Sequence, residues 1–221
     1  CNGIYYLCRI TGSWQYCSNE ENFKADILNT IPCEFIEIGS IENVPGKVIN
    51  AFRARSTVQR IWGESETENT ALEMSKMLYN RRKQTKYFDT REILKENFLS
   101  LLLPEDVEEI VFLYLQFKYH YLLYSSSNKV DTQTYEGVMI NPQTYKKCYI
   151  QVKTGNVALD GSNYMELTKN GDEFYLFTTC ENYSNLSENV KAISKKEILD
   201  FINDYPELLP DRVRIWKEEV R

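Results

Sequence analysis

The residues best suited to chemistry lie in a predicted β-hairpin over residues 135–155, with a turn at the Asn-Pro-Gln-Thr stretch 141–144. Side chains alternate between the two faces of a strand, so Gln151 and Lys153 share one face. If Glu136 points to the same side, a carboxylate, an amide oxygen and an ammonium meet within reach of one small ligand. Metal-assisted hydrolysis uses this combination.

Ligand type predicts which metal would bind. Hard divalent cations such as Mg²⁺, or Mn²⁺ in its place, take oxygen ligands and keep several waters. Glu136 and the carbonyl of Gln151 would supply such oxygens. The cation would polarise a phosphoryl oxygen, and Lys153 would position the attacking water or stabilise transition-state charge.

These residues carry a family resemblance. Glu136, followed fifteen positions later by Gln151-Val152-Lys153, resembles the acid and the second half-motif of the PD-(D/E)xK nucleases, in the Mrr-like QxK branch where glutamine replaces the second acid. The resemblance covers residues 100–205, about half the chain, and Tyr135-Glu136 stands where the commonest pattern has Pro-Asp. It implies a magnesium-dependent enzyme that cuts DNA.

The family also supplies a glutamate from the helix before the hairpin. The segment 103–115 predicts that helix, because proline opens it, acids follow, and apolar residues recur at helical spacing. Glu108 lies four residues before Phe112, near the buried stripe, and is the best candidate for the third acidic group. An acid that favours the helix dipole explains Glu108 equally well, and Glu105, Glu109 and Asp131 are alternatives.

The predicted fold is α/β (α+β) in three parts. Residues 1–62 are expected to form a small N-terminal β-barrel, 63–100 a helical connector, and 101–221 a restriction-endonuclease-like mixed sheet flanked by helices. The apolar run 174–177 predicts a central strand covered on both faces. A capping box at Ser194-Lys195-Lys196-Glu197 predicts a late helix that ends at Pro206.

Residues 1–62 bear a second, weaker resemblance. The order of Tyr-Tyr-Leu-Cys-Arg-Ile-Thr-Gly-Ser-Trp, the Ala-Asp-Ile stretch at 25–27 and Val-Pro-Gly-Lys-Val at 44–48 is similar to EVE and PUA-like modules. Such modules hold modified bases or RNA, which implies a pocket for an unusual or flipped base. Trp14 and Tyr16 are the expected aromatic walls, although either side chain is more often part of a core.

Local basic clusters supply a candidate nucleic-acid footprint, although the net charge of −6 argues against binding through bulk charge. One cluster lies in the N-terminal part and the other at the predicted end of a helix, where cations also complement the helix dipole. The clustered residues are Arg53, Arg55, Arg60, Arg81, Arg82 and Lys83.

Composition excludes several classes of function. The 221 residues hold a single histidine, His120, so mechanisms built on a catalytic histidine have one candidate, and a helix-end or packing role suits it better. The chain has no Walker A or GxGxxG loop and no CxxC pair. Its apolar runs are too short to span a bilayer, which favours a cytoplasmic location with reduced, buried cysteines.

The predicted function is a restriction or phage-defence endonuclease whose N-terminal module recognises a base and whose C-terminal domain cuts. DNA is the expected substrate in preference to RNA, with no membrane partner. One active site per subunit would suggest a homodimer for double-strand cleavage, and the chain is expected to belong to a longer protein or a defence complex. The alternatives are a nucleic-acid-binding module without turnover and a subunit that docks a partner.

Overall fold

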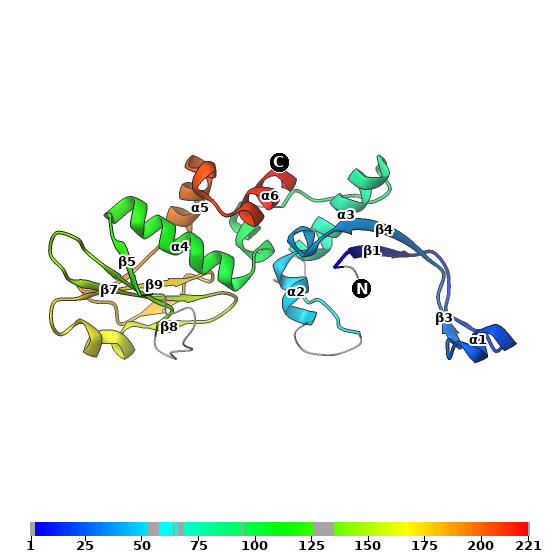
Figure 1. The fold of residues 1–221 in the computed structure, drawn as a ribbon, viewed down its shortest axis with the longest axis horizontal. Helices are drawn as coiled ribbons and strands as arrows, with labels where there is room; N and C mark the ends of the chain where they lie inside the picture. The colour runs from blue at the N-terminus through cyan, green and yellow to red at the C-terminus, as the bar shows by residue number, and fades with distance from the viewer. Residues whose placement is uncertain are drawn as a thin grey trace. The chain divides into compact units, whose positions relative to one another are not determined.

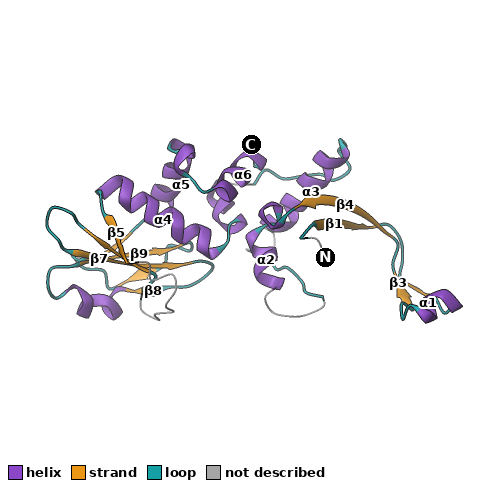
Figure 2. Ribbon diagram, in the orientation of Figure 1, coloured by secondary structure: helices purple, strands orange, loops and turns teal. Residues whose placement is uncertain are grey.

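The computed structural model describes residues 3–52, 58–63, 65, 69–93, 95–125 and 135–220. It is a mixed α/β protein (Figures 1 and 2). The chain divides into two compact units: unit 1 comprises Cys1–Val44 and Leu72–Glu92, and unit 2 comprises Pro45–Ala71 and Ile93–Arg221. The stretch 63–100, expected to be a connector, therefore contributes to both units.

Unit 2 is built on a five-stranded mixed sheet with the order β11-β9-β7-β6-β5. Strands β7, β9 and β11 run parallel, whereas β5, β6 and β7 are antiparallel neighbours. The predicted hairpin is confirmed, because β6 pairs with β7 from Gly137 opposite Ile150 to Ile140 opposite Lys147. The bounds are β5 (Leu122–Ser125), β6 (Gly137–Ile140), β7 (Lys147–Lys153), β9 (Glu173–Thr178) and β11 (Val190–Ala192).

The hairpin turn is fixed by its first residue. Oδ1 of Asn141 accepts hydrogen bonds from the backbone N–H groups of Gln143 (2.9 Å) and Thr144 (3.0 Å). Tyr145 then takes a left-handed conformation, with φ +58°, and its N–H donates to Asn141 O at 2.8 Å. These bonds set the register that places Gln151 and Lys153 at the far end of β7.

Both faces of this sheet are covered, as the apolar sequence of β9 predicts. Helix α4 (Pro104–Tyr119) lies on one face, and the 3₁₀ segment η4 (Gly161–Thr168) lies on the other (Figure 1). The side chains of Ile150, Phe174 and Leu176 are fully buried. The polar residue Gln151 therefore sits in a strand that has no solvated face at that position.

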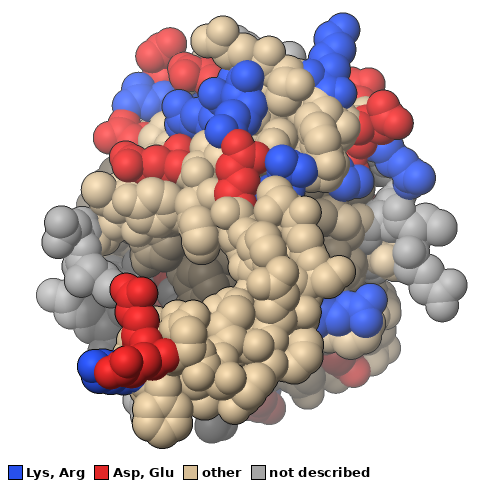
Figure 3. Space-filling model, turned by 90° about the vertical axis from the view of Figure 1, so that its right-hand side faces the viewer, with Lys and Arg blue, Asp and Glu red and all other residues tan. Residues whose placement is uncertain are grey.

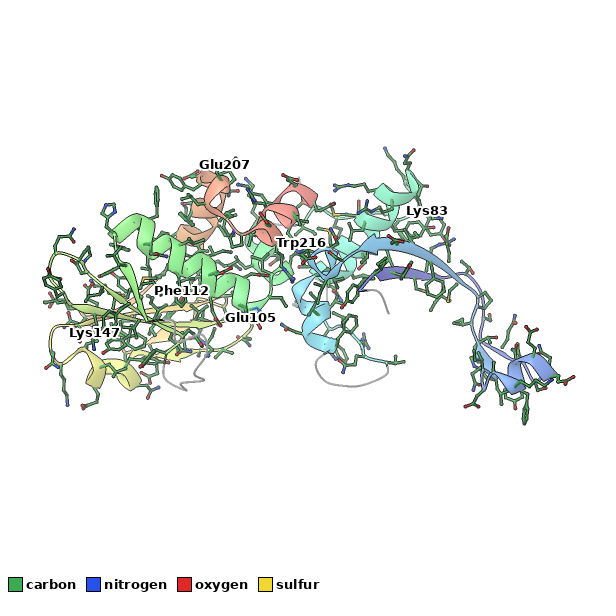
Figure 4. All side chains as sticks on the ribbon, in the orientation of Figure 1. Lys83, Glu105, Phe112, Lys147, Glu207 and Trp216 are labelled. Atoms are coloured by element: carbon green, nitrogen blue, oxygen red, sulfur yellow. The ribbon has the colours of Figure 1, made fainter. Side chains whose placement is uncertain are left out.

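Helix α4 begins at Pro104 as predicted. Asp106 Oδ2 accepts a hydrogen bond from the N–H of Leu103 at 2.9 Å, and His120 is the C-cap, with φ +56°. Phe112 lies between α4 and the sheet (Figure 4). A Cβ built on Gly137 would approach Phe112 Cζ to 2.6 Å, so the helix packs closely on the first residue of β6.

The remaining elements of unit 2 follow the sequence only in part. Helix α5 (Lys195–Asp204) has the predicted capping box between Ser194 and Glu197. Helix α6 (Asp211–Glu219), which buries Val213 and Trp216, was not predicted. The other elements are α2 (Gly46–Phe52), η2 (Lys95–Leu101), β8 (Leu159–Asp160), β10 (Tyr183–Ser184) and η5 (Pro206–Leu208).

Unit 1 consists of two antiparallel ladders and short helices. Strand β1 (Tyr5–Ile10) pairs with β4 (Cys33–Gly39), and β2 (Gln15–Tyr16) pairs with β3 (Asn29–Thr30). Arg9 donates two hydrogen bonds to Oε2 of Glu34, which also accepts one from the hydroxyl of Tyr79 at 2.9 Å. These bonds join the β1–β4 ladder to α3 (Thr70–Lys83). The other elements are α1 (Glu20–Lys24) and η1 (Ile41–Asn43).

The small barrel expected over residues 1–62 is not confirmed. In the described residues, the strands of unit 1 form two separate two-stranded ladders, and neither closes on itself. Residues 46–52 form α2, because Val48 and Ile49 donate their N–H groups to the carbonyl of Pro45 and start a helix. Residues 58–61, which the expected barrel would include, lie in no strand.

Two further observations concern composition. Within the described residues, every helix is too short or too polar to cross a lipid bilayer. The described cysteines are free thiols, of which Cys148 is buried, Cys8 is exposed and Cys17, Cys33 and Cys180 are half-buried. The expectation of buried cysteines therefore holds for Cys148 alone.

Candidate functional site

The predicted convergence of three side chains occurs at the carboxyl end of β7. Gln151 Nε2 donates to Oε1 of Glu136 at 2.9 Å, and Lys153 Nζ donates to the same oxygen at 2.7 Å. The backbone N–H of Glu136 donates to the carbonyl of Ile150 at 2.7 Å, which anchors the acid beside β7. The hairpin register thus brings Glu136, Gln151 and Lys153 together.

The amide of Gln151 has one unsatisfied atom. The side chain is 1% exposed, and its Oε1 is buried without a hydrogen-bond donor among the described residues. The amide of Gln151 is oriented by Glu136, because an ionised carboxylate accepts hydrogen bonds and therefore faces the NH₂ group of the amide, not its carbonyl. An acceptor buried in this way costs about 1–3 kcal/mol unless something occupies its lone pairs.

Glu108 joins this group from α4. Helix α4 packs along the sheet, and Figure 4 shows Glu105, in the first turn of α4, at the opposite end of this packed pair from Lys147, at the start of β7. The start of α4 therefore lies at the same end of the sheet as Lys153. Burial, and after it the negative charges of Glu136 and Glu105, raise the pKa of the half-buried Glu108 to about 7, against the opposing effect of Lys153.

Of the alternatives for the third acid, Glu105 and Glu109 are exposed, and Asp131 lies outside the described residues. The charge of Glu105 raises the pKa of Glu108. Glu108 is half-buried and its pKa responds to the charge of Glu136, so it stays the best candidate of the three for the third acid. A carboxyl held near neutrality beside a second carboxylate is typical of functional sites, although ion-pair networks also produce it.

Tyr164 and Asp160 are neighbours of the site that no sequence pattern indicates. Burial raises the pKa of Tyr164, and the charges of Glu136 and Asp160 raise it further. Asp160 caps η4 by accepting from the N–H (2.9 Å) and the hydroxyl (2.7 Å) of Ser162. The Asp-Gly-Ser sequence at 160–162 is a capping signal, but the fold alone shows that η4 returns beneath β9 toward Glu136.

The donor set at this corner suits a hard dication. Glu136 and Glu108 offer carboxylate oxygens, and Gln151 offers an amide oxygen that lacks a partner. Among the residues that the structure describes, no three His, Cys, Asp or Glu side chains are grouped to hold a metal ion. An ion here would depend on the amide oxygen and on water or substrate oxygens, as Mg²⁺ sites commonly do.

The residues predicted to bind nucleic acid are distributed over both units. Trp14 and Tyr16 are 61% and 59% exposed in unit 1, so neither fills a core. Lys83 forms an ion pair with Glu34, and the guanidinium of Arg60 lies 4.0 Å from the ring centroid of Trp62 in unit 2. Arg81 and Arg82 are exposed, and Arg53 and Arg55 lie outside the described residues.

The surface drawn in Figure 3 has a mixed charge. Lysine and arginine side chains are interspersed with acidic ones, and wide uncharged areas separate these groups (Figure 3). Nucleic acid held by bulk charge requires a basic stripe on one face. The described residues on this face form no such stripe (Figure 3), and the footprint expected at Arg81, Arg82 and Lys83 stays a prediction.

In comparisons with family models, curated proteins and solved structures, the chain has no significant match.

Proposed function

We propose that this chain is a metal-dependent phosphodiesterase that cuts nucleic acid, with DNA preferred to RNA, and that Glu136, Gln151, Lys153 and Glu108 form its active site. The observation that carries the proposal is the buried carbonyl oxygen of Gln151, which lacks a hydrogen-bond donor among the described residues while the amide NH₂ of the same side chain donates to Glu136. Buried polar groups are normally satisfied, and a cation is one partner that suits an acceptor beside a carboxylate.

Electrostatics favours a cation as that partner. Burial is the largest cause of the raised pKa of Glu108, about 7, and the negative charges of Glu136 and Glu105 add to it, so a positive charge placed at this corner would favour the ionised form. A dication would accept the lone pairs of Gln151 Oε1 and would favour the ionised form of Glu108. When bound, it would supply Lewis-acid activation of a phosphodiester and a water of lowered pKa.

The protein side chains have separate roles in this proposal. Glu136, Gln151 and Glu108 would hold the ion through oxygen atoms. Lys153 is 41% exposed in its side chain, so its ammonium can turn from Glu136 toward a phosphate oxygen without leaving a buried position. It would stabilise the charge that develops on the phosphoryl group and orient the attacking water.

The restriction-endonuclease-like description of unit 2 belongs to the same proposal. The PD-(D/E)xK resemblance of residues 100–205 requires an acid and a QxK triplet on paired strands of one sheet, and the five-stranded mixed sheet with its β6–β7 hairpin is consistent with that. Recognition of a base, modified or not, is proposed for the exposed side chains of Trp14 and Tyr16, which can stack on bases without a barrel.

A cleavage assay tests this function. Supercoiled plasmid with and without modified cytosine, and a labelled RNA, are incubated with the protein in Mg²⁺, Mn²⁺ or EDTA. We expect nicked or linear DNA only with a divalent ion, and its loss in Glu136→Gln. If the folded wild-type protein cuts none of these substrates with either ion, the nuclease proposal is wrong, and a binding module or a partner-docking subunit explains the chain better.

A further inference from the structure

A cleft in unit 2 begins directly after Lys153. Its volume is about 600 Å³, and it lies among α2, η2, the start of α5 and the loops that follow β7 and β9. Ligands of sheets with parallel strands bind at the carboxyl ends of the strands, and β7 and β9 are parallel. The polar side chains that line it include Lys47, Asn97, Thr154, Asn156, Thr179 and Lys195.

The charge of this cleft is opposite to that of the chain. Its described lining contains two lysines, Lys47 and Lys195, and no acidic residue, whereas the whole chain carries a net charge of −6. A concave surface that concentrates one sign of charge focuses the field and attracts ions of opposite sign. The cleft therefore favours an anion.

Lys195 occupies a position that helix stability disfavours. It is the first residue of the ten-residue α5, where the helix dipole repels a cation, and Lys196 follows it. Its backbone N–H donates to Oε1 of Glu181 at 2.9 Å, whereas its ammonium makes no ion pair within the described residues. The start of the helix is capped by Ser194, Glu197 and Glu181, whereas the ammonium of Lys195 is available to an anion in the cleft.

Close contacts join the walls of the cleft. A Cβ on Gly46 would lie 2.3 Å from the backbone of Leu102, so α2, which carries Lys47, is held tightly against the end of η2. The loops after β7 and β9 are joined by the hydrogen bond from Gly155 N to Thr179 Oγ1 at 2.8 Å. A cleft of about 600 Å³ is large enough to accept about one nucleotide.

We propose that this cleft binds the sugar-phosphate backbone of the nucleic-acid strand next to the scissile phosphate, with Lys195 and Lys47 contacting phosphate oxygens. The choice of ligand rests on the proposed nuclease function. The cleft follows Lys153 by one residue, so a strand seated in it would pass the catalytic corner. The binding test below needs no metal and no turnover, so it can fail or succeed independently of cleavage.

The first experiment measures binding of a fluorescein-labelled ten-nucleotide thymidine oligomer by anisotropy in EDTA, across a series of salt concentrations. The Lys195→Ala variant should bind the oligomer roughly fivefold more weakly than the wild type, and its slope of log K against log salt concentration should be shallower by about 0.7. In the double variant with Lys47→Ala, that slope should be shallower by about 1.4. The control is Lys196→Ala, whose lysine is 83% exposed and pairs with Asp200. It should bind like the wild type.

The outcomes separate the two proposals. If the protein binds the oligomer in a way that depends on Lys195 but never cleaves nucleic acid, the proposed binding cleft is supported and the proposed nuclease function is wrong. Equal affinities for wild type, Lys195→Ala and Lys196→Ala, or no binding by the wild type, overturn the cleft even if cleavage is observed. Inorganic phosphate serves as competitor: displacement of the oligomer at equimolar phosphate would identify a free-anion site and also overturn the strand proposal.

A second measurement uses Cys180, a half-buried free thiol in the cleft lining. Its alkylation rate is followed by peptide mass spectrometry with and without the oligomer. We expect the bound strand to slow modification of Cys180. An unchanged rate at saturating oligomer would contradict occupancy of the cleft.

Discussion

The ammonium of Lys153 lies 2.7 Å from Oε1 of Glu136, and the two residues approach each other from adjacent strands of one hairpin. Their side chains are 41% and 24% exposed. An ion pair this accessible contributes about 0–1 kcal/mol to folding. Lys153 therefore contributes little to the stability of the fold, so any loss of activity on its removal reports on its role in catalysis.

Lys153→Ala should cut DNA about 10²–10³-fold more slowly than the wild type, because the transition state loses a positioned charge. Binding of DNA and the midpoint of thermal unfolding should stay close to wild type. Plasmid nicking rates and a melting curve measure both. Lys147→Ala, at the opposite end of β7, is the matched control and should retain full activity.

Glu108→Gln should change how stability depends on pH. The pKa of Glu108 is about 7 in the folded protein and near 4.5 in the unfolded chain, so between these pH values the folded state holds a proton that the unfolded chain has released. The free energy of unfolding therefore falls as the pH rises through this interval. Glutamine has no such loss, so the variant should be about 2 kcal/mol more stable than wild type at pH 8 and equal to it near pH 4.5.

Urea unfolding at several pH values, without divalent ions, measures this difference. Glu109→Gln removes an exposed carboxylate one residue away and should leave the pH profile unchanged. A wild-type stability that rises steadily from pH 5 to pH 8, parallel to that of Glu108→Gln, would show that Glu108 is an ordinary surface acid.

Binding of Mn²⁺ should depend on the same proton. Glu108 must ionise before it can hold a cation, so binding releases a proton below about pH 7. Calorimetric titration should show affinity increasing from pH 6 to pH 8 in the wild type, with a flatter profile and weaker binding in Glu108→Gln. Identical pH profiles in the two proteins would remove Glu108 from the ligand set.

Gly137→Ala should destabilise the protein by about 1–3 kcal/mol through overpacking. A Cβ at this position meets Phe112 Cζ at 2.6 Å, and the ring is wedged between α4 and the sheet. A double-mutant cycle with Phe112→Leu, followed by denaturant unfolding, checks the cause. If the double variant loses as much free energy of unfolding as the two single variants together, the contact with Phe112 does not explain why glycine is needed at position 137.

The sequence predicted the parts of the site that depend on local pattern. Strand alternation and the Asn141 turn place Glu136, Gln151 and Lys153 together because the register of a two-stranded hairpin is a local property. The helical spacing of apolar residues after Pro104 predicted that Glu108 lies on the helix near its buried face. The sequence could not show that Gln151 Oε1 lacks a donor, because that depends on what packs around β7 from distant segments.

The N-terminal barrel shows where pattern fails. Apolar runs in β1 and β4 predicted strands, and these exist, but closure into a barrel needs further strands, and α2 occupies residues 46–52 instead. The sequence did not predict the cleft, because Lys47 and Lys195 are far apart in sequence and line one cleft only because α2 and α5 both pack on η2.

The most direct test of the central claim is a crystal of the protein soaked in Mn²⁺ and measured at the manganese absorption edge. We expect an anomalous peak at about 2.1–2.3 Å from a carboxylate oxygen of Glu136 and from Gln151 Oε1, with water completing the shell. A fully soaked crystal with no peak at this corner, and with Lys153 still paired to Glu136, would contradict the account.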